Sequence, residues 1–188
     1  MDVNIVRSGQ IFQYNPATEG YSANDVFTPL TGTPTISSDK LRLNAAEVLT
    51  YDKRFQFGNL EFLLTIPAAP TAGDVRSFGF KNNDNKGMMV FDITGAVFSA
   101  KVYDSKGTLI ATKTINWDSD WTAAEAQYRI AWNNRNIYFL VDDVFVARFD
   151  EGFDKDIVAE DIMGSQPMGI YINNGNADNV DVSLINYV

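Results

Sequence analysis

The sequence of 188 residues contains no cysteine and no histidine. Without cysteine the chain has no disulfide, no thiol nucleophile and no thiolate ligand for a metal ion. Without histidine it has no imidazole to act as a general base or as a metal ligand. A serine nucleophile would therefore need a lysine or a carboxylate as its base. These two absences exclude a large part of known enzyme chemistry.

Positive charge and long apolar runs are also scarce. The formal net charge is −9 and the sequence pI is about 4.4, so the mean field repels phosphate backbones and anionic lipids. We expect no nucleic-acid partner and no membrane insertion, since no run is long enough to cross a bilayer. The first residues, Met1–Arg7, lack an export-signal pattern, which predicts synthesis in the cytosol, with later release to a virion surface as an alternative.

What the sequence does contain is alternation of apolar and polar residues, which indicates an all-β protein. We interpret the chain as one domain, residues 1–188, with an irregular leading segment at 1–35 and a sandwich core at 36–188. The strands that we expect in the core are Lys40–Leu43, Glu47–Tyr51, Gly58–Ile66, Val75–Lys81, Gly87–Ile93, Val97–Tyr103, Thr108–Ile115, three strands within Tyr128–Phe149, Met168–Ile172 and Val180–Tyr187.

Four stretches resemble the laminarinase-like branch of the concanavalin A-like lectin and glucanase superfamily. They are Phe57–Pro67, Tyr128–Asp143, Pro167–Asn173 and Val180–Tyr187, and their order and spacing also match. The resemblance implies a two-sheet antiparallel jelly-roll β-sandwich, whose concave face carries the ligand cleft.

The same resemblance bears on catalysis. Retaining glycosidases of this kind place their carboxylates on alternate residues of one strand, because the chemistry needs two carboxyl groups about 5 Å apart. The strand at that place is Met88–Thr94, or alternatively Val75–Phe80, and Asp92 is the one carboxylate that either strand contains. We therefore predict that the chain has no catalytic residues and is not an enzyme.

Aromatic and amide side chains are the candidates for carbohydrate binding, since sugars pack on aromatic rings while amides take their hydroxyls. The alternative for the aromatic residues is an ordinary place in the core, with Trp117 and Trp121 the more exposed. The candidates are Trp117, Trp121, Trp132, Tyr171, Asn173 and Asn174. No cofactor is required, although the resemblance implies a structural calcium ion at Asp181.

Three functions stay open. The first is a non-catalytic structural or attachment module on an assembly surface, such as a bacteriophage capsid decoration or accessory protein, with other protein chains or glycans as partners and self-association into a homo-oligomer. The second is a free carbohydrate-binding module, a lectin. The third is a divergent glycoside hydrolase that works through Asp92.

Overall fold

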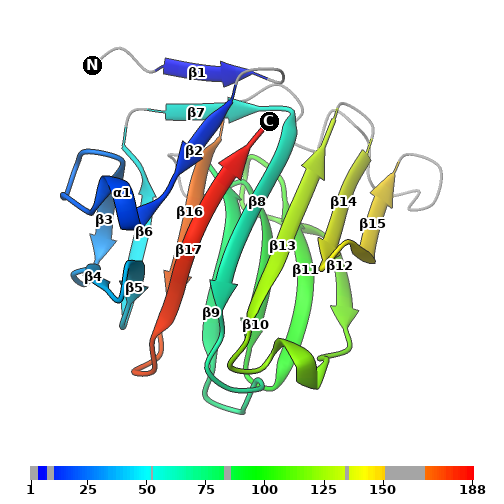
Figure 1. Ribbon diagram of the computed structural model, residues 1–188. Helices are drawn as coiled ribbons and strands as arrows, with labels where there is room; N and C mark the ends of the chain where they lie inside the picture. The colour runs from blue at the N-terminus through cyan, green and yellow to red at the C-terminus, as the bar shows by residue number, and fades with distance from the viewer. Residues whose placement is uncertain (1–3, 8–10, 52, 83–85, 134–135, 151–167) are drawn as a thin grey trace.

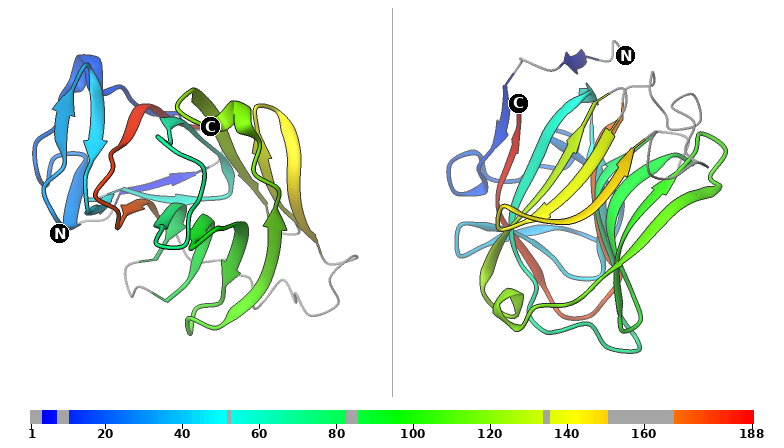
Figure 2. Two further views of the ribbon diagram at one scale, coloured as in Figure 1. Left: turned by 90° about the horizontal axis from the view of Figure 1, so that it is seen from below. Right: turned by 90° about the vertical axis from the view of Figure 1, so that its right-hand side faces the viewer.

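The computed structural model describes residues 4–7, 11–51, 53–82, 86–133, 136–150 and 168–188. Within them the chain forms two large antiparallel sheets that pack face to face (Figures 1 and 2). Helical structure in this part is limited to α1 (Pro16–Glu19) and a 3₁₀ turn at Ser119–Trp121. None of the described helices has the length and apolarity to cross a membrane. The predicted all-β sandwich is confirmed.

One sheet has seven strands. In order across the sheet they are β12 (Leu109–Ile115), β11 (Val97–Tyr103), β10 (Met88–Thr94), β9 (Val75–Lys81), β16 (Gly169–Asn174), β6 (Ala46–Thr50) and β3 (Phe27–Thr31). All neighbouring pairs are antiparallel. The consecutive strands β9 and β10, together with β16, which is distant from them in sequence, therefore occupy the middle of one surface.

The other sheet has eight strands. Across it lie β15 (Val144–Asp150), β14 (Asn136–Val141), β13 (Glu125–Trp132), β8 (Gly58–Thr65), β17 (Val180–Tyr187), β5 (Lys40–Leu43) and β4 (Thr35–Ser37), with β2 (Phe12–Tyr14) pairing to β17. A separate parallel pair joins β1 (Asn4–Arg7) to β7 (Lys53–Gln56). Part of the leading segment is thus regular, because β2 and β3 extend the two sheets.

Large aromatic residues fill the space between the sheets. Phe78 of the seven-stranded sheet meets Tyr128 of the other sheet edge to face, with ring centroids 5.0 Å apart, and contacts Phe62 in the same way at 5.7 Å. Such ring pairs add about 0.5–1.5 kcal/mol each beyond the burial of their area. Since side chains alternate along a strand, the inward position of Phe78 turns Ser77 and Gly79 outward.

Gly79 has a conformation that few other residues could adopt. Its φ is 151°, and a Cβ at this position would lie 2.2 Å from the main-chain oxygen of Met89. The position therefore requires glycine. A Cβ there would also lie 2.8 Å from the Ile130 side chain of the other sheet, so glycine lets the two sheets pack closely at this point.

Candidate functional site

The outer face of the seven-stranded sheet, turned away from the other sheet, carries a line of polar residues. The strand registers pair Glu47 with Asn173, Asn173 with Ser77, Ser77 with Asp92, and Asp92 with Ser99. We call Glu47, Asn173, Ser77, Asp92 and Ser99 the polar row. Each position is the outward one on its strand, so the five side chains share one surface.

The neighbouring line on this face places a tyrosine and a lysine beside the polar row. Its registers pair Tyr171 with Gly79, Gly79 with Val90, and Val90 with Lys101. Val90 is fully buried and Tyr171 almost so. The middle of this face is thus apolar and enclosed, with ionisable groups around it.

Asp92 lies on the central strand β10 and is held by two donors. The Lys101 Nζ lies 2.5 Å from Asp92 Oδ2, and the Thr94 hydroxyl donates to the same oxygen at 2.8 Å. The Ser99 hydroxyl makes a longer contact, 3.4 Å, with the main-chain oxygen of Asp92. These contacts fix the direction of the carboxylate and place a positive charge beside it.

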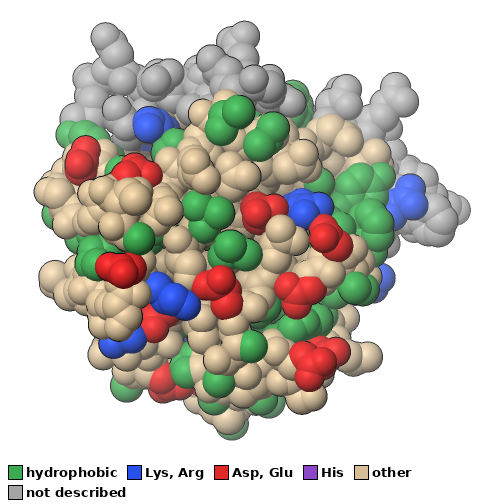
Figure 3. Space-filling model, in the orientation of Figure 1, with side chains coloured by type: hydrophobic (Ala, Val, Ile, Leu, Met, Phe, Trp, Pro, Cys, Tyr) green, Lys and Arg blue, Asp and Glu red, His purple; other side chains and the backbone are tan. Residues whose placement is uncertain are grey.

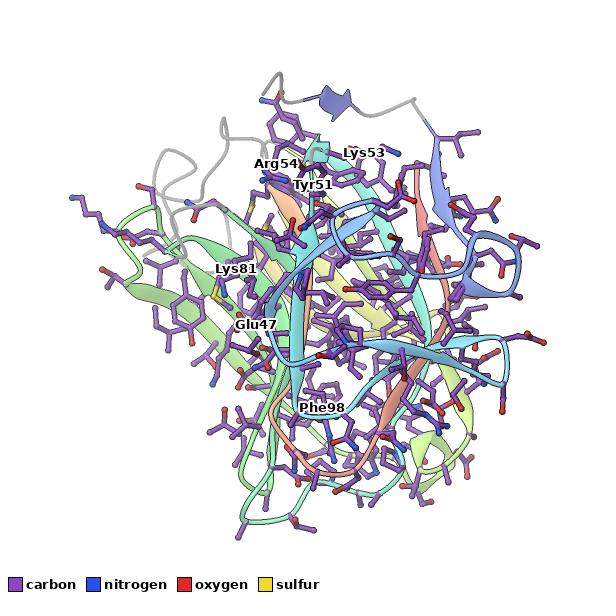
Figure 4. All side chains as sticks on the ribbon, turned by 90° about the vertical axis from the view of Figure 1, so that its left-hand side faces the viewer. Glu47, Tyr51, Lys53, Arg54, Lys81 and Phe98 are labelled. Atoms are coloured by element: carbon purple, nitrogen blue, oxygen red, sulfur yellow. The ribbon has the colours of Figure 1, made fainter. Side chains whose placement is uncertain are left out.

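Glu47 is the second carboxylate of the polar row, and Lys81 is its partner. The Lys81 Nζ donates to Glu47 Oε1 at 2.8 Å, and Figure 4 shows the two side chains next to each other on the outer side of the sheet. The same ammonium lies 4.0 Å from the centroid of the Tyr171 ring, a cation–π contact. Lys81 thus connects the carboxylate and the tyrosine.

The Tyr171 hydroxyl is also part of this network. Burial raises its pKa well above the ordinary value of 10, and its hydrogen bond to Glu47 acts in the same direction, whereas a hydrogen bond with Ser77 lowers it. The phenol therefore stays neutral and acts as a hydrogen-bond donor over the ordinary pH range. The Tyr171 hydroxyl therefore links Glu47, at one end of the polar row, to Ser77, in the middle of the row.

The arrangement brings two carboxylates and two ammonium groups to one surface, so the formal charges cancel. Glu47 and Asp92 are separated by three strand spacings, or about 14 Å at the backbone. The Asp92 carboxylate is bonded to Lys101 on β11, and the Glu47 carboxylate to Lys81 on β9. Oriented carboxylates, neutral hydroxyls and amides can together bind a sugar and act on its glycosidic bond.

Two of the six predicted carbohydrate-binding residues, Tyr171 and Asn173, lie on this outer face. Asn174, the next residue of β16, points inward and is fully buried. Its amide donates to the main-chain oxygens of Leu43 and Asp178. Both asparagines belong to a strand, and the alternation along it gives them different surroundings.

The three tryptophans lie away from the polar row. Trp132 is buried in the core, while Trp117 and Trp121 are half-buried and pack edge to face on Phe98, at 5.5 and 6.1 Å. The Trp117 indole donates to the Thr122 hydroxyl at 3.0 Å. The polar connector suggested exposure for this pair, but the aromatic side chains turn back onto the core. Their role in carbohydrate binding stays a prediction.

Asp181 forms a two-pronged ion pair instead of a metal site. Arg42 Nε and Nη2 donate to its two oxygens at 2.7 and 2.8 Å. This pairing raises the pKa of the Arg42 guanidinium, which stays charged. A calcium ion does not fit here, because a positive group already occupies the space beside the carboxylate. Nor do the described residues contain a cluster of three acidic side chains.

Two cavities in the described part of the chain lie elsewhere. One, of about 440 Å³, is beside α1 and includes Tyr21 and Lys53; the other, of about 270 Å³, lies at the end of β13 near Trp132. Neither includes a residue of the polar row. We place the candidate active site at the polar row because oriented ionisable groups converge there, whereas cavity size alone says nothing about chemistry.

Glu47, Lys81 and Lys101 were missed in the sequence analysis. Alternation marks each of them as an outward residue of its strand, and this signal was available. What the sequence does not give is the order β10-β9-β16-β6, in which β16 lies between strands that are distant from it in the chain. Only that order makes Glu47 a companion of Asp92.

Comparisons with known proteins show the family and the fold of the chain. The model of the family described as Glycosyl hydrolases family 16 matches residues 21–184. A search of curated protein sequences found no match. Many solved structures share the fold, and the following three cover nearly all of the chain.

An apo Crh5 transglycosylase superimposes with a TM-score of 0.73 and 16% identity, covering 94% of this chain and 83% of that one. A laminarinase from Flavobacterium sp. UMI-01 gives a TM-score of 0.72 at 15% identity, with coverages of 94% and 98%. An endo-β-1,3-glucanase from Pyrococcus furiosus gives 0.72 at 14% identity, with 94% of each chain covered. At these identities the likeness shows the fold, and the resemblance to the laminarinase-like branch is confirmed.

These findings contradict the prediction that the chain is not an enzyme. The matching family consists of glycoside hydrolases, and the similar structures are hydrolases and transglycosylases. The prediction rested on the carboxylates of Met88–Thr94 and Val75–Phe80 alone, and the family match over residues 21–184 overturns it. The findings also support the hydrolase alternative better than a capsid attachment role, for which they give no support.

Proposed function

Because the chain belongs to glycosyl hydrolase family 16, we propose that it hydrolyses or transfers a neutral β-linked glucan on the outer face of the seven-stranded sheet. The observation that supports this most directly is the position of Asp92. It lies on a central strand, is oriented by Lys101 and Thr94, and shares the polar row with Glu47. Oriented charges in a partly enclosed place are a common feature of catalytic sites.

The substrate class follows from the charge of the site and from the structural relatives. Two carboxylates and two lysines give a formal charge of zero, so the site favours a neutral polymer over a polyanion. Similar structures are a laminarinase, a β-1,3-1,4-glucanase and an endo-β-1,3-glucanase. A β-1,3-glucan or a mixed-linkage β-1,3-1,4-glucan is therefore the substrate we assign.

In glycan hydrolysis the bond from the anomeric carbon to the leaving oxygen breaks, that oxygen gains a proton, and water supplies the new bond. In transfer, a sugar hydroxyl replaces the water. We assign Asp92 to the side of the anomeric carbon, as the carboxylate that attacks it or activates the incoming hydroxyl. Since β10 carries no second carboxylate, the leaving oxygen takes its proton from water, while Glu47, which is ion-paired with Lys81, holds the Tyr171 hydroxyl in place.

The test is a product assay with the purified protein. It is incubated with soluble β-1,3-glucan and with β-1,3-1,4-glucan, with and without a fluorescent oligosaccharide acceptor, and chain lengths are separated by chromatography. Shortened chains indicate hydrolysis, and longer labelled products indicate transfer. We expect Asp92→Asn to lower the rate by about 100-fold or more, and Glu47→Gln, which loosens the contacts that hold Lys81 and Tyr171, to lower it by about tenfold.

Asp143→Asn is the matched control. Asp143 is an aspartate at a turn of the other sheet with φ 63°, a conformation that asparagine tolerates. This variant should keep the wild-type rate. The proposal is overturned if the wild-type protein changes neither polymer, or if Asp92→Asn and Asp143→Asn react equally fast.

A further inference from the structure

A shallow depression on the eight-stranded sheet has the composition of a carbohydrate-binding surface. It has a volume of about 270 Å³ and is lined by Phe57, Asn59, Ala131, Trp132, Asn133 and Tyr138. We call this the aromatic depression. It lies where β8, β13 and β14 run side by side, on the sheet whose outer face is turned toward the viewer in Figure 3.

The strand register explains why the surface is hollow at this point. Ala131 pairs with Asn59 on one side and with Tyr138 on the other. The three side chains point to the same face, and the middle one is a methyl group. An aromatic ring and an amide therefore stand on either side of a small apolar floor.

Tyr138 is supported from the side away from Ala131. Its ring meets Phe145 edge to face at 5.7 Å, and the Arg148 guanidinium carbon lies 5.5 Å from its centroid. Both supporting residues come from β15, the next strand of the sheet. The ring is thus held at the wall of the depression before any ligand arrives, which reduces the entropy cost of binding.

Trp132 supports the depression from beneath. It is only 3% exposed and lines the depression, and its ring packs inward on Phe80 of the other sheet, with ring centroids 5.6 Å apart. The floor of the depression is therefore rigid. Phe57 contacts the indole at 5.1 Å and has φ 56°, a region that non-glycine residues seldom occupy.

We propose that the aromatic depression binds a sugar residue of a neutral glycan, at a site separate from the polar row. Aromatic rings match the apolar face of a pyranose, and the Asn59 and Asn133 amides match its hydroxyls. The lining contains no charged residue, which selects a neutral ligand. A polymer can bind there and at the polar row at the same time. Binding at the first site raises the local concentration of the polymer at the second, so the polymer dissociates less readily.

The test measures binding in the Asp92→Asn background, so that cleavage does not change the ligand. Soluble β-1,3-glucan and β-1,3-1,4-glucan, and short oligosaccharides of each, are titrated while tryptophan emission is followed, because Trp132 lines the depression. We expect Tyr138→Ala to weaken binding by about tenfold and Asn59→Ala by a smaller factor. Tyr138→Phe keeps the ring and should bind within about twofold of the Asp92→Asn parent.

Circular dichroism and unfolding curves show whether the variants are folded, and the Tyr138→Phe protein separates loss of the ring from loss of its hydroxyl. Equal affinities for Tyr138→Ala and Tyr138→Phe would overturn the proposal, as would a complete lack of binding by the Asp92→Asn parent. Failure of the product assay would refute catalysis at the polar row and leave this measurement intact. The two proposals can therefore fail separately.

Discussion

Both sheets carry ion pairs on their outer faces, but the pairs differ in how far water reaches them. On the seven-stranded sheet the side chains of Lys81 and Glu47 are 9% and 19% exposed. On the eight-stranded sheet those of Arg129 and Asp143 are 28% and 73% exposed, and charged residues are spread over that face in Figure 3. The same kinds of group are thus enclosed on one sheet and solvated on the other.

This difference matters because charge–charge interactions grow as water is removed, while exposed pairs contribute little. Enclosed groups also keep their orientation, and such preorganisation is what a reacting centre needs. The seven-stranded face is therefore built for chemistry on a bound ligand. The eight-stranded face offers an uncharged depression of aromatic and amide groups, which suits binding alone.

The largest effect is expected from adding a side chain at Gly79, in the middle of the seven-stranded sheet. Gly79→Ala would place a Cβ 2.2 Å from the Met89 oxygen at a φ of 151°. We expect a loss of about 3 kcal/mol in the free energy of unfolding, measured by urea denaturation. Gly73→Ala is the control, since no atom lies within 4 Å of its Cβ position, and it should change stability by less than about 0.5 kcal/mol. A tolerated Gly79→Ala would show that the two sheets are not closely packed at this position.

The next effect compares the two sheets directly. Lys81→Met leaves Glu47 without its ion partner in an enclosed place and removes the cation from the Tyr171 ring, so we expect a loss of about 2 kcal/mol. Arg129→Met breaks more exposed pairs with Glu61 and Asp143 and should cost about 0.5 kcal/mol. Denaturation curves of both variants measure the difference. Equal losses would mean that the two faces do not differ in their electrostatics.

Much of the fold could be predicted because strand periodicity is a local property of the sequence. Val75–Lys81, Val97–Tyr103 and Val180–Tyr187 have the bounds that alternation indicated. The strand pair on either side of Asn133 could be predicted equally well, since apolar and polar residues alternate in both strands and a polar turn joins them. The predicted ends of strands were wrong by one or two residues where no glycine or proline marks the end, as at Asn174.

The candidate site could not be predicted in the same way, because it depends on which distant strands are neighbours. Glu47 and Asp92 are 45 positions apart in the printed sequence. They share one face of the sheet because β16 and β9 lie between their two strands. The tryptophans show the opposite problem. Their chemistry suggested a sugar platform, but the large apolar rings of Trp117 and Trp121 gain more from packing on Phe98 than from solvent.

The smallest effect concerns an exposed pair on the eight-stranded sheet. The hydrogen bond from the Ser183 hydroxyl lowers the pKa of Glu125 from its ordinary value of 4.5, burial opposes this, and Lys40 adds to the lowering. Because the folded-state pKa lies below the unfolded one, the contribution to stability is present above about pH 4.5 and is lost as the pH falls through the folded value. Ser183→Ala should therefore be slightly less stable than wild type near pH 6, with a gap that closes toward about pH 3, as measured by urea denaturation across that range. Ser183→Thr keeps the hydroxyl and should follow the wild-type curve, whereas a gap that did not change with pH would show that Ser183 acts through packing and not through the charge of Glu125.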